Sequence, residues 1–267
     1  MPDTHRLAPG ASIDLSRAPT RAEGFHDDKN TARQEFRDLR DELIEWQRRL
    51  YAEGERKLLI VLQAMDAGGK DGTTKKLMRG VNPQGVRVES FKAPTSHELA
   101  HDFLWRIHRV VPRAGYISVF NRSHYEDILV PRVHNLVPEK VWRARYRMIN
   151  DFEAMLAGTG THILKFYLHI SPEEQKQRFR ERVHNPLKQW KFSVQDIEKA
   201  REWPAYMAAY EEVLSTCSTE SAPWHVIPAD QKWYRNLAVM RVVVDRLRAM
   251  APQYPPHGYD PEMIEIE

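Results

Sequence analysis

The chain of 267 residues contains a single cysteine, Cys217, which excludes an internal disulfide and suggests a reducing compartment. It has no apolar run near the ~20 residues that a membrane-spanning helix needs. Its first ten residues, MPDTHRLAPG, lack the apolar core of a signal peptide. The sequence also shows no internal repeat and no linker that would divide it. These absences predict a soluble cytoplasmic protein with no membrane partner.

The charge of the chain is nearly balanced, because 40 Lys and Arg residues oppose 37 Asp and Glu residues. A nucleic-acid partner is not expected, since no recognition motif accompanies this small basic excess. The hydrophobic content of 42% is sufficient for a sizeable core. We therefore expect a globular enzyme or binding protein.

Five β-rich apolar runs alternate with helical patterns along the chain. The predicted strands are 57–63, 86–91, 115–120, 162–170 and 225–228, and the main predicted helices are 31–53, 70–81, 138–157, 194–215 (bent near Pro204) and 234–250. Most strands are continuously apolar, as strands covered on both faces are. The pattern predicts a three-layer α/β fold with a five-stranded parallel sheet. Residues 1–30 are expected to form an extended arm, 31–250 a single domain and 251–267 a surface tail.

The segment 58–74 reads LLIVLQAMDAGGKDGTT, so a buried strand leads into glycines, a lysine and a helix start. Such a turn directs backbone N–H groups, an ammonium and a helix N-terminus at one point, which favours phosphate binding. Ala64 and Asp71 depart from the P-loop pattern G-x-x-x-x-G-K-[ST]. Asp66 would tolerate a neighbouring phosphate only with a metal ion between them. An ordinary turn with a surface lysine is the alternative.

A second group of polar residues follows the predicted strand 115–120, in the run FNRSHYED at 120–127. Ligands of open α/β folds bind at the carboxyl ends of strands. Because Asn121 is neutral, we expect Asp127 and Asp66 to hold the metal and Arg122 to contact a transferring phosphoryl oxygen. The spacing of Ser123 and Glu126 also fits a helix capping box, which is the alternative.

An arginine-bearing helix is predicted to begin at Pro172. Arg178 and Arg182 are four residues apart and share one face of it. Arginine offers a planar fork to phosphoryl oxygens, so we expect a helical lid over about 172–193. A solvated helix held by its own ion pairs is the alternative.

Three further cations, Lys75, Lys76 and Arg79, lie on the predicted helix that leaves the glycine loop. Their spacing would let them follow a long polyanion away from the site. A solubility face is the alternative.

The segment His97-Glu98-Leu99-Ala100-His101 has the H-E-x-x-H pattern of zinc proteases. His108 is one position too late for the extended form of that pattern. Glu98 also completes a capping box with Thr95. A zinc protease is therefore a remote alternative.

Three segments together resemble the family-2 polyphosphate kinases: MDAGGKDGT at 65–73, FNRSHYED at 120–127, and IPADQKW at 227–233 followed by Arg235. The resemblance runs from about Thr31 to Met250. It implies a P-loop kinase-like fold with a helical lid, and Mg²⁺-dependent, reversible transfer of phosphate between inorganic polyphosphate and the nucleotides AMP, ADP and ATP. The second segment is similar to the subgroup that accepts nucleoside mono- and diphosphates.

The resemblance also implies that Mn²⁺ can replace Mg²⁺. With the long amphipathic N-terminal helix, it favours a homodimer or homotetramer. An ATP-dependent nucleoside-monophosphate kinase, which would share the fold and the loop, is the alternative.

The resemblance and the residue chemistry together give each site residue a role. The predicted catalytic residues are Asp66, Lys70, Arg122, Asp127 and Arg178, with Asp66 and Asp127 as metal ligands. The predicted phosphate-binding residues are Ala67, Gly68, Gly69, Lys70, Asp71, Gly72, Thr73 and Arg182, and the predicted polyphosphate path comprises Lys75, Lys76 and Arg79. The predicted nucleotide acceptor site comprises Phe91, Lys92, Pro94, Thr95, Phe103 and Trp105.

Overall fold

The five predicted strands form one sheet in which all strands run in the same direction. The computed structural model describes residues 4–193, 200–256, 258 and 264, and its strands are β1 (Lys57–Gln63), β2 (Val86–Ser90), β3 (Ile117–Asn121), β4 (Thr161–His169) and β5 (Trp224–Pro228). Their order is β2-β3-β1-β4-β5. Ile60 in the central strand faces Val119 on one side and Leu164 on the other. Every predicted strand lies within two residues of an observed one.

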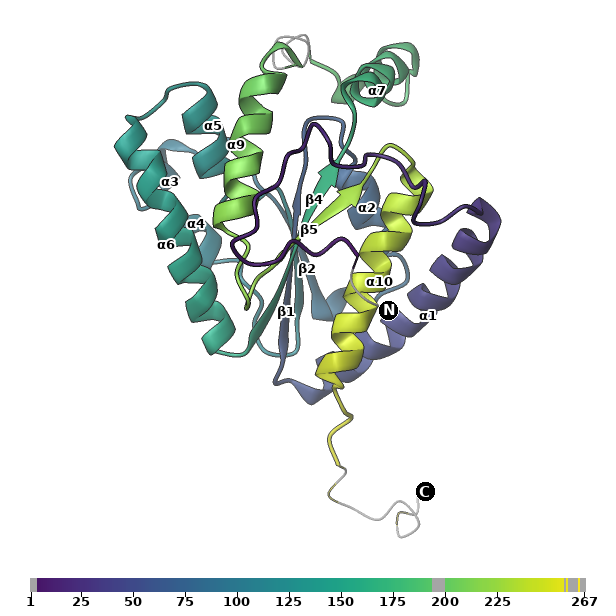
Figure 1. The fold of residues 1–267 in the computed structure, drawn as a ribbon. Helices are drawn as coiled ribbons and strands as arrows, with labels where there is room; N and C mark the ends of the chain where they lie inside the picture. The colour runs from purple at the N-terminus through teal and green to yellow at the C-terminus, as the bar shows by residue number, and fades with distance from the viewer. Residues whose placement is uncertain (1–3, 194–199, 257, 259–263, 265–267) are drawn as a thin grey trace.

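Helices cover both faces of the sheet and give the predicted three-layer fold (Figure 1). One face packs against α1 (Lys29–Glu53), α2 (Lys70–Leu77) and α10 (Lys232–Met250), and the other against α4 (Trp105–His108), α5 (Glu126–Val133), α6 (Glu139–Gly158) and α9 (Trp203–Thr216). The short elements η1 (Pro83–Gly85) and α3 (Ser96–Leu99) lie in connections, and α7 (Pro172–His184) and η2 (Gln189–Lys191) follow β4. In Figure 1, α7 stands beyond the carboxyl ends of the strands.

The central strand contributes to both cores because successive side chains of a strand point to opposite faces. Leu58, Ile60 and Leu62 pack on the side of α1 and α10, whereas Leu59 and Val61 pack on the side of α6 and α9. All five side chains are fully buried. This burial on both faces explains why the strand is a continuous apolar run.

The apolar face of α1 packs against α10 in the core of the same chain. Leu43 and Leu50 are fully buried and belong to the same core cluster as Val243 and Leu247 of α10. The amphipathic character of α1 therefore does not by itself support the predicted oligomer, which stays a prediction from the resemblance.

Several helix boundaries differ from the sequence prediction. The helix predicted at 70–81 ends at Leu77, since Gly80 has a φ of 87°. Near Pro204 the predicted bend corresponds to a break in the helix: residues 200 and 201 are helical, Glu202 forms a turn, and α9 begins at Trp203 with Pro204 in its first turn, where its missing N–H costs nothing. Part of that predicted helix, 194–199, lies outside the described residues.

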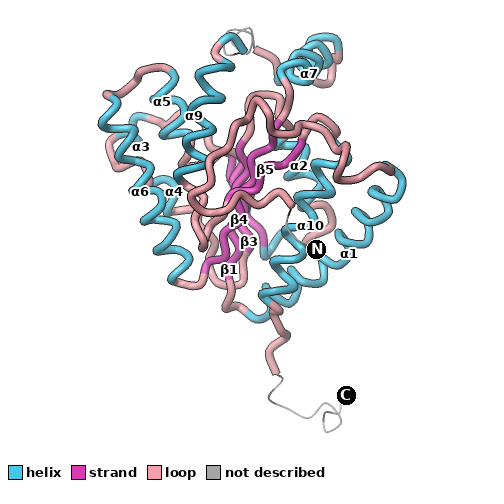
Figure 2. The backbone as a smooth tube through the Cα atoms, viewed as in Figure 1, coloured by secondary structure: helices cyan, strands magenta, loops and turns pink. Residues whose placement is uncertain are grey.

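The N-terminal arm crosses the molecule in front of the sheet, as the tube in Figure 2 shows. Arg6 forms an antiparallel bridge with His225, so the arm covers the edge of β5. Further along, Thr20 Oγ1 donates to Asp230 Oδ2 at 2.8 Å. The arm is thereby tied to the segment that follows β5.

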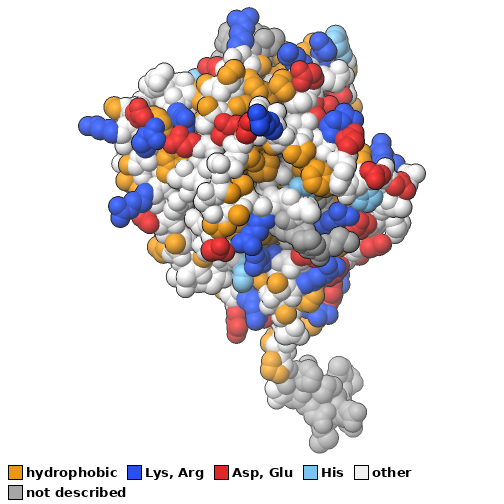
Figure 3. Space-filling model, viewed as in Figure 1, with side chains coloured by type: hydrophobic (Ala, Val, Ile, Leu, Met, Phe, Trp, Pro, Cys, Tyr) orange, Lys and Arg blue, Asp and Glu red, His pale blue; other side chains and the backbone are white. Residues whose placement is uncertain are grey.

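Basic and acidic side chains are interspersed on the face shown in Figure 3. None of the helices in the described part of the chain combines the length and the apolarity that a membrane crossing requires.

Candidate active site

The glycine loop begins where β1 ends, at the carboxyl edge of the sheet. Residues 64–69 curl between Gln63 and Lys70, the first residue of α2. Ala67 and Gly69 have φ angles of 62° and 107°, a region that is costly for residues with a side chain. A Cβ at Gly69 would lie 1.8 Å from Nη1 of Arg235. Both conformation and space therefore require glycine at this position.

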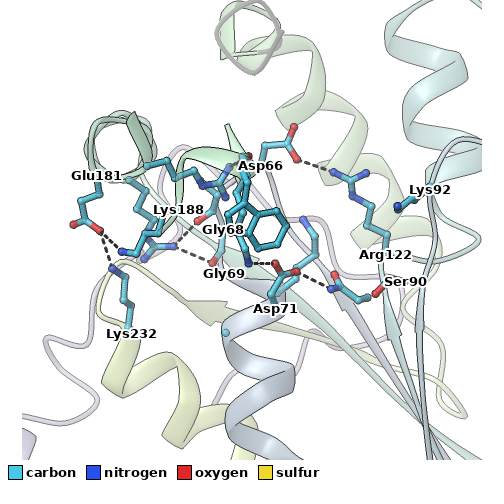
Figure 4. Close-up of a pocket in the computed structure, with 18 of the residues that line it drawn as sticks. Asp66, Gly68, Gly69, Asp71, Ser90, Lys92, Arg122, Glu181, Lys188 and Lys232 are labelled. Carbon is cyan, nitrogen blue, oxygen red and sulfur yellow. Dashed lines mark hydrogen bonds and ion pairs between the residues drawn. The ribbon is translucent and has the colours of Figure 1, made fainter. Parts of the chain in front are cut away.

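A cavity of about 470 Å³, here called the first cavity, opens over the loop (Figure 4). Its lining residues are Asp66–Gly72, Ser90, Phe91, Lys92, Asn121, Arg122, Arg178, Glu181, Arg182, Lys188, Trp190, Lys191 and Lys232. Eight of these residues are basic and three are acidic, so the cavity attracts polyanions. Of the predicted phosphate-binding residues, Thr73 does not line it, and the Thr73 N–H donates to the Gly69 carbonyl within the helix at 3.0 Å.

The ammonium of Lys70 is buried inside the loop. Its Nζ donates to the Ala64 carbonyl at 2.8 Å and contacts that of Met65 at 3.4 Å. Burial, followed by the positive charge of Arg122, lowers the pKa of Lys70 to about 8, against the opposing effect of nearby carboxylates. An anion in the loop would favour the charged form of this lysine.

Arg122 and Asp66 point toward each other at the cavity wall (Figure 4). Their Nη2 and Oδ1 atoms are 2.8 Å apart. Burial lowers the pKa of Arg122, but the carboxylates of Glu126 and Asp66 outweigh this effect and raise it. Arg122 also has a left-handed backbone, with φ of 64°, directly after β3. Arg122 therefore occupies a costly backbone conformation.

Asp71 stands where the P-loop pattern has serine or threonine. It accepts a hydrogen bond from Asn121 Nδ2 at 2.8 Å and pairs with Lys191 Nζ at 2.8 Å. Burial raises the pKa of Asp71, but the bonds from Lys191 and Asn121 outweigh it and lower the pKa. We call the Asp71–Lys191 pair the lid latch, because it joins the lid region to the first turn of α2.

Arg178 is buried beneath the loop, although it belongs to the predicted lid. Its Nη1 and Nη2 groups donate to the backbone carbonyls of residues 67, 68, 229 and 230 at 2.6 to 3.0 Å. Its Nε donates to Glu174 Oε1 at 2.7 Å. These contacts, here called the loop clamp, engage all five N–H groups of the guanidinium. The predicted direct contact of Arg178 with a transferring oxygen therefore gains no support from this geometry.

A second guanidinium, that of Arg235, lies beside the clamp and is almost fully buried. Its Nη2 donates to Asn236 Oδ1 at 3.0 Å, and its Nη1 lies 3.4 Å from the Gly68 carbonyl. Burial, followed by the charge of Arg178, lowers the pKa of Arg235 to about 9. The loop thus rests on two buried cations.

The remaining predicted cations lie elsewhere. Arg182 lines the first cavity, and its Nη1 donates to the Lys191 carbonyl at 3.4 Å. Lys75, Lys76 and Arg79 are exposed and line neither this cavity nor the next one described. Their role as a polyphosphate path stays a prediction.

A second cavity of about 520 Å³ adjoins the first. The two share Asp66, Phe91, Lys92 and Arg122. The second is walled by apolar and aromatic residues of α5, α9 and the neighbouring loops, among them Pro94, Val130, Pro131, Leu136, Val137, Tyr206 and Tyr210. It is suited to a ligand with a flat ring and an anionic end at the junction.

The predicted acceptor residues divide into two groups. Phe91, Lys92 and Pro94 line the second cavity, whereas Thr95, Phe103 and Trp105 do not. Thr95 caps α3, and the Arg145 guanidinium lies 5.0 Å from the Phe103 ring centre.

The indole of Trp105 is contacted by His97, His101 and Arg109. His101 stacks on it with centroids 4.1 Å apart, and the Arg109 guanidinium lies 4.6 Å from its centre. Stacking of a base on Trp105 is therefore disfavoured. Tyr206 and Tyr210 line the second cavity and were not among the predicted residues, although their i, i+4 spacing on a helix was an available signal.

Asp127 lies away from the first cavity and lines the second. Its Oδ2 pairs with Arg106 Nη2 at 3.1 Å. Burial raises the pKa of Asp127, although Arg106 and Arg145 oppose this effect. Besides Asp66, the acid whose charge acts on both Arg122 and Lys70 is Glu126, which the sequence suggested as a helix-capping residue. No Ser123–Glu126 cap forms, since the Ser123 hydroxyl accepts from the Tyr125 N–H instead, at 3.3 Å.

The H-E-x-x-H segment forms no metal site in this structure. Glu98 accepts the Thr95 N–H at 2.7 Å, which completes the predicted capping box. Across the described residues, no three His, Cys, Asp or Glu side chains are grouped to hold a metal ion by themselves. Any metal in the first cavity would therefore complete its coordination with substrate oxygens and water, as Mg²⁺ commonly does.

Comparisons with known proteins all match this chain to the same family of proteins. A family model described as "Polyphosphate kinase 2 (PPK2)" matches residues 26–255. The chain is 52% identical over 264 residues to an AMP/ADP-polyphosphate phosphotransferase of Meiothermus ruber, covering 98% of this chain and 99% of that protein. It is 41% identical over 262 residues to an ADP-polyphosphate phosphotransferase of Rhodopseudomonas palustris, covering 94% and 91% of the two chains.

A solved structure gives the same result. The crystal structure of polyphosphate kinase 2 from Arthrobacter aurescens TC1 aligns with a TM-score of 0.92 at 40% identity, covering 96% of this chain and 92% of that one. The similarity in sequence and in fold therefore spans nearly the entire chain.

Gly69→Ala should weaken binding of inorganic pyrophosphate at least tenfold, because the added Cβ collides with the buried Arg235 and the φ of 107° disfavours a side chain. Isothermal titration calorimetry measures this affinity. Gly24→Ala is the matched control, since Gly24 also has a positive φ, 84°, but nothing lies within 4 Å of its added Cβ. Equal affinities of Gly69→Ala and Gly24→Ala would contradict the role of the loop.

The affinity for pyrophosphate should also depend on pH through Lys70. With its pKa near 8, this lysine is charged below that pH, and about one-tenth of it is charged at pH 9. The affinity advantage of the wild type over Lys70→Met should therefore shrink roughly tenfold between pH 7 and pH 9. Comparing the two proteins at each pH cancels the titration of the ligand itself. An advantage that stays constant to pH 9 would show that Lys70 does not bind the anion.

Proposed function

The chain belongs to the polyphosphate kinase 2 family, and on that premise we propose that it transfers phosphate between inorganic polyphosphate and the nucleotides AMP and ADP. The observation that carries this proposal is the contact between two unlike cavities. The basic first cavity meets the more apolar second cavity at Asp66, Phe91, Lys92 and Arg122. A polyanion and a nucleotide can therefore meet end to end at one wall.

The donor and the acceptor occupy separate cavities in this proposal. Polyphosphate lies in the first cavity, where the cations outnumber the acids. The nucleotide base lies in the second cavity, near Tyr206 and Tyr210, with its phosphates directed at Lys92 and Arg122. Phosphoryl transfer requires in-line positioning and charge neutralisation rather than covalent chemistry by the protein.

The glycine loop and Lys70 hold the phosphates around the transferred group. The first N–H groups of α2 have no acceptor within the helix and face the cavity with the loop. Lys70 exchanges its contact with the Ala64 carbonyl for phosphate oxygens. Arg122, at the junction, neutralises charge on the transferring oxygens, and Arg182 assists from the lid.

Arg178 acts through the loop in this proposal. All of its N–H groups hold backbone carbonyls or Glu174, so its contribution is the shape and the charge of the loop. Lys75, Lys76 and Arg79 are assigned to distant phosphates of a long donor, because they lie on or directly after the helix that leaves the loop.

A divalent metal ion is part of this chemistry, and we assign it as Mg²⁺, with Mn²⁺ as a substitute. The acidic oxygens at the junction fit such an ion, since Asp66 and Glu126 both lie close enough to influence Arg122 and Lys70. When bound, the ion neutralises charge on the phosphate oxygens. The predicted ligand Asp127 would have to leave Arg106 to take part, so Glu126 is the better partner for Asp66.

The test of the function is incubation of the protein with polyphosphate, Mg²⁺ and AMP in the absence of any nucleoside triphosphate. Separation of the nucleotides should show ADP first and ATP later. Lys70→Met should lower the rate about 10²- to 10³-fold through loss of a positioned cation. Lys57→Met is the matched control, because Lys57 begins β1 and so lies at the end of that strand away from the glycine loop.

The dependence of the reaction on ATP distinguishes the proposed polyphosphate phosphotransferase from a nucleoside-monophosphate kinase. Formation of ADP from AMP only when ATP is supplied would favour a nucleoside-monophosphate kinase. Equal losses in Lys70→Met and Lys57→Met would remove the loop from the mechanism.

Three carboxylate variants test the metal assignment. Asp66→Asn and Glu126→Gln should raise the Mg²⁺ concentration for half-maximal rate about tenfold or more, because each removes a negatively charged ligand. Asp127→Asn should raise it less, since this carboxylate is held by Arg106. A larger rise in Asp127→Asn than in Glu126→Gln would restore the pair Asp66 and Asp127.

A further inference from the structure

The loop between β3 and α5 carries two residues that point into the protein rather than toward either cavity. His124 and Tyr125 are fully buried, and both contact the carboxylate of Glu153 on α6. Tyr125 Oη donates to Glu153 Oε1 at 2.8 Å, and His124 Nε2 lies 3.1 Å from the same oxygen. One buried carboxylate therefore holds two consecutive residues of the loop.

Lys165 on β4 completes this arrangement. Its Nζ donates to Glu153 Oε2 at 2.6 Å, to Tyr125 Oη at 2.8 Å and to the Cys217 carbonyl at 2.6 Å. All three protons of the ammonium are thus used. The side chains of Lys165 and Glu153 are 0% and 1% exposed, so the ion pair is shielded from water.

Such a pair is a poor source of stability. Removing two charges from water costs much of what their attraction returns, and well-packed apolar residues often serve equally well. Hydrogen bonds fix the relative orientation of the groups that they join, whereas contacts between apolar side chains do not. The pair therefore needs an explanation other than the strength of the core.

The residues on either side of the anchored pair supply that explanation. Arg122 precedes it with a left-handed backbone, φ 64°, and lines both cavities. Glu126 and Asp127 follow it and line the second cavity. Residues 122–127 thus have a buried, hydrogen-bonded centre, and the residues at both ends of this run line the cavities. A costly backbone conformation such as that of Arg122 persists only where its surroundings hold it.

We propose that Glu153 and Lys165 are positioning residues for phosphate transfer, which fix Arg122 and Glu126 through Tyr125 and His124. This inference rests on the function proposed above. Neither residue lines the first or the second cavity, so neither touches substrate. Their buried charges serve the geometry of residues 122–127 rather than the stability of the core.

The test replaces the ion pair by an apolar pair, Glu153→Leu with Lys165→Met in one protein. We expect kcat with polyphosphate and AMP to fall at least tenfold, while affinity for inorganic pyrophosphate stays within twofold, because the glycine loop is held separately by Arg178. Amide hydrogen exchange of residues 121–127, measured by mass spectrometry, should become at least tenfold faster.

Leu156→Ala is the matched control. Leu156 lies on the buried face of α6, one turn after Glu153, and it belongs to the same core cluster without being part of the anchor. This variant should lower the thermal midpoint yet leave kcat within twofold of the wild type. Tyr125→Phe keeps the ion pair but removes the hydroxyl that bonds to both Glu153 and Lys165, so it should give an intermediate loss of kcat. It keeps the test decisive if the double variant does not fold.

Two results would overturn the proposal. One is a double variant, or a folded Tyr125→Phe protein, with kcat within twofold of the wild type. The other is an equal loss of kcat in Leu156→Ala, which would make the effect one of general stability. A wild-type protein without transfer activity would instead refute the proposed function, and hydrogen exchange at 121–127 would still decide whether the anchor fixes this segment.

Discussion

The glycine loop depends on one buried guanidinium. Arg178 joins the carbonyls of residues 67 and 68 to those of residues 229 and 230, so the turn after β1 and the turn after β5 are held as a unit. The same contact places a positive charge, reinforced by Arg235, under the loop, and this charge favours an anion there. Glu174 is the carboxylate that pairs with the clamp. Shape and electrostatic attraction therefore have a common origin, and Thr20 extends the unit to the N-terminal arm through Asp230.

The sheet brings this loop together with the residues of β3. Because β1 and β3 are parallel neighbours, Leu62 pairs in register with Asn121, and Arg122 follows at the same edge. The order β2-β3-β1-β4-β5 then leaves a basic cavity and a more apolar cavity on the two sides of the Asp66–Arg122 pair. A family that transfers phosphate between an inorganic polymer and a nucleotide needs two such unlike surfaces in contact. The fold supplies them where the carboxyl ends of its strands meet.

The sheet and the loop could be predicted from the sequence because their signals are local. Leu58–Leu62 is apolar throughout since both faces are covered, Arg122 directly follows β3, and Lys70 begins α2 after the short loop that follows β1. The partners of Arg178 could not be predicted, because helical spacing gives a face but not its neighbour, and backbone carbonyls leave no mark on composition. Trp105 was misleading for a similar reason: an aromatic residue in a helix does not reveal that His101 and Arg109 already contact its ring.

The lid latch differs from the loop clamp in its access to water. The Asp71 and Lys191 side chains are 64% and 34% exposed, whereas that of Arg178 is 6% exposed. Dissolved ions screen exposed pairs far more than shielded ones. Rising ionic strength should therefore weaken the Asp71–Lys191 pair, while the contacts of Arg178 that hold the turn beneath it stay the same. Two adjacent parts of the first cavity would thus respond differently to salt: the ion pair at its edge would weaken, whereas the turn beneath it would keep its shape.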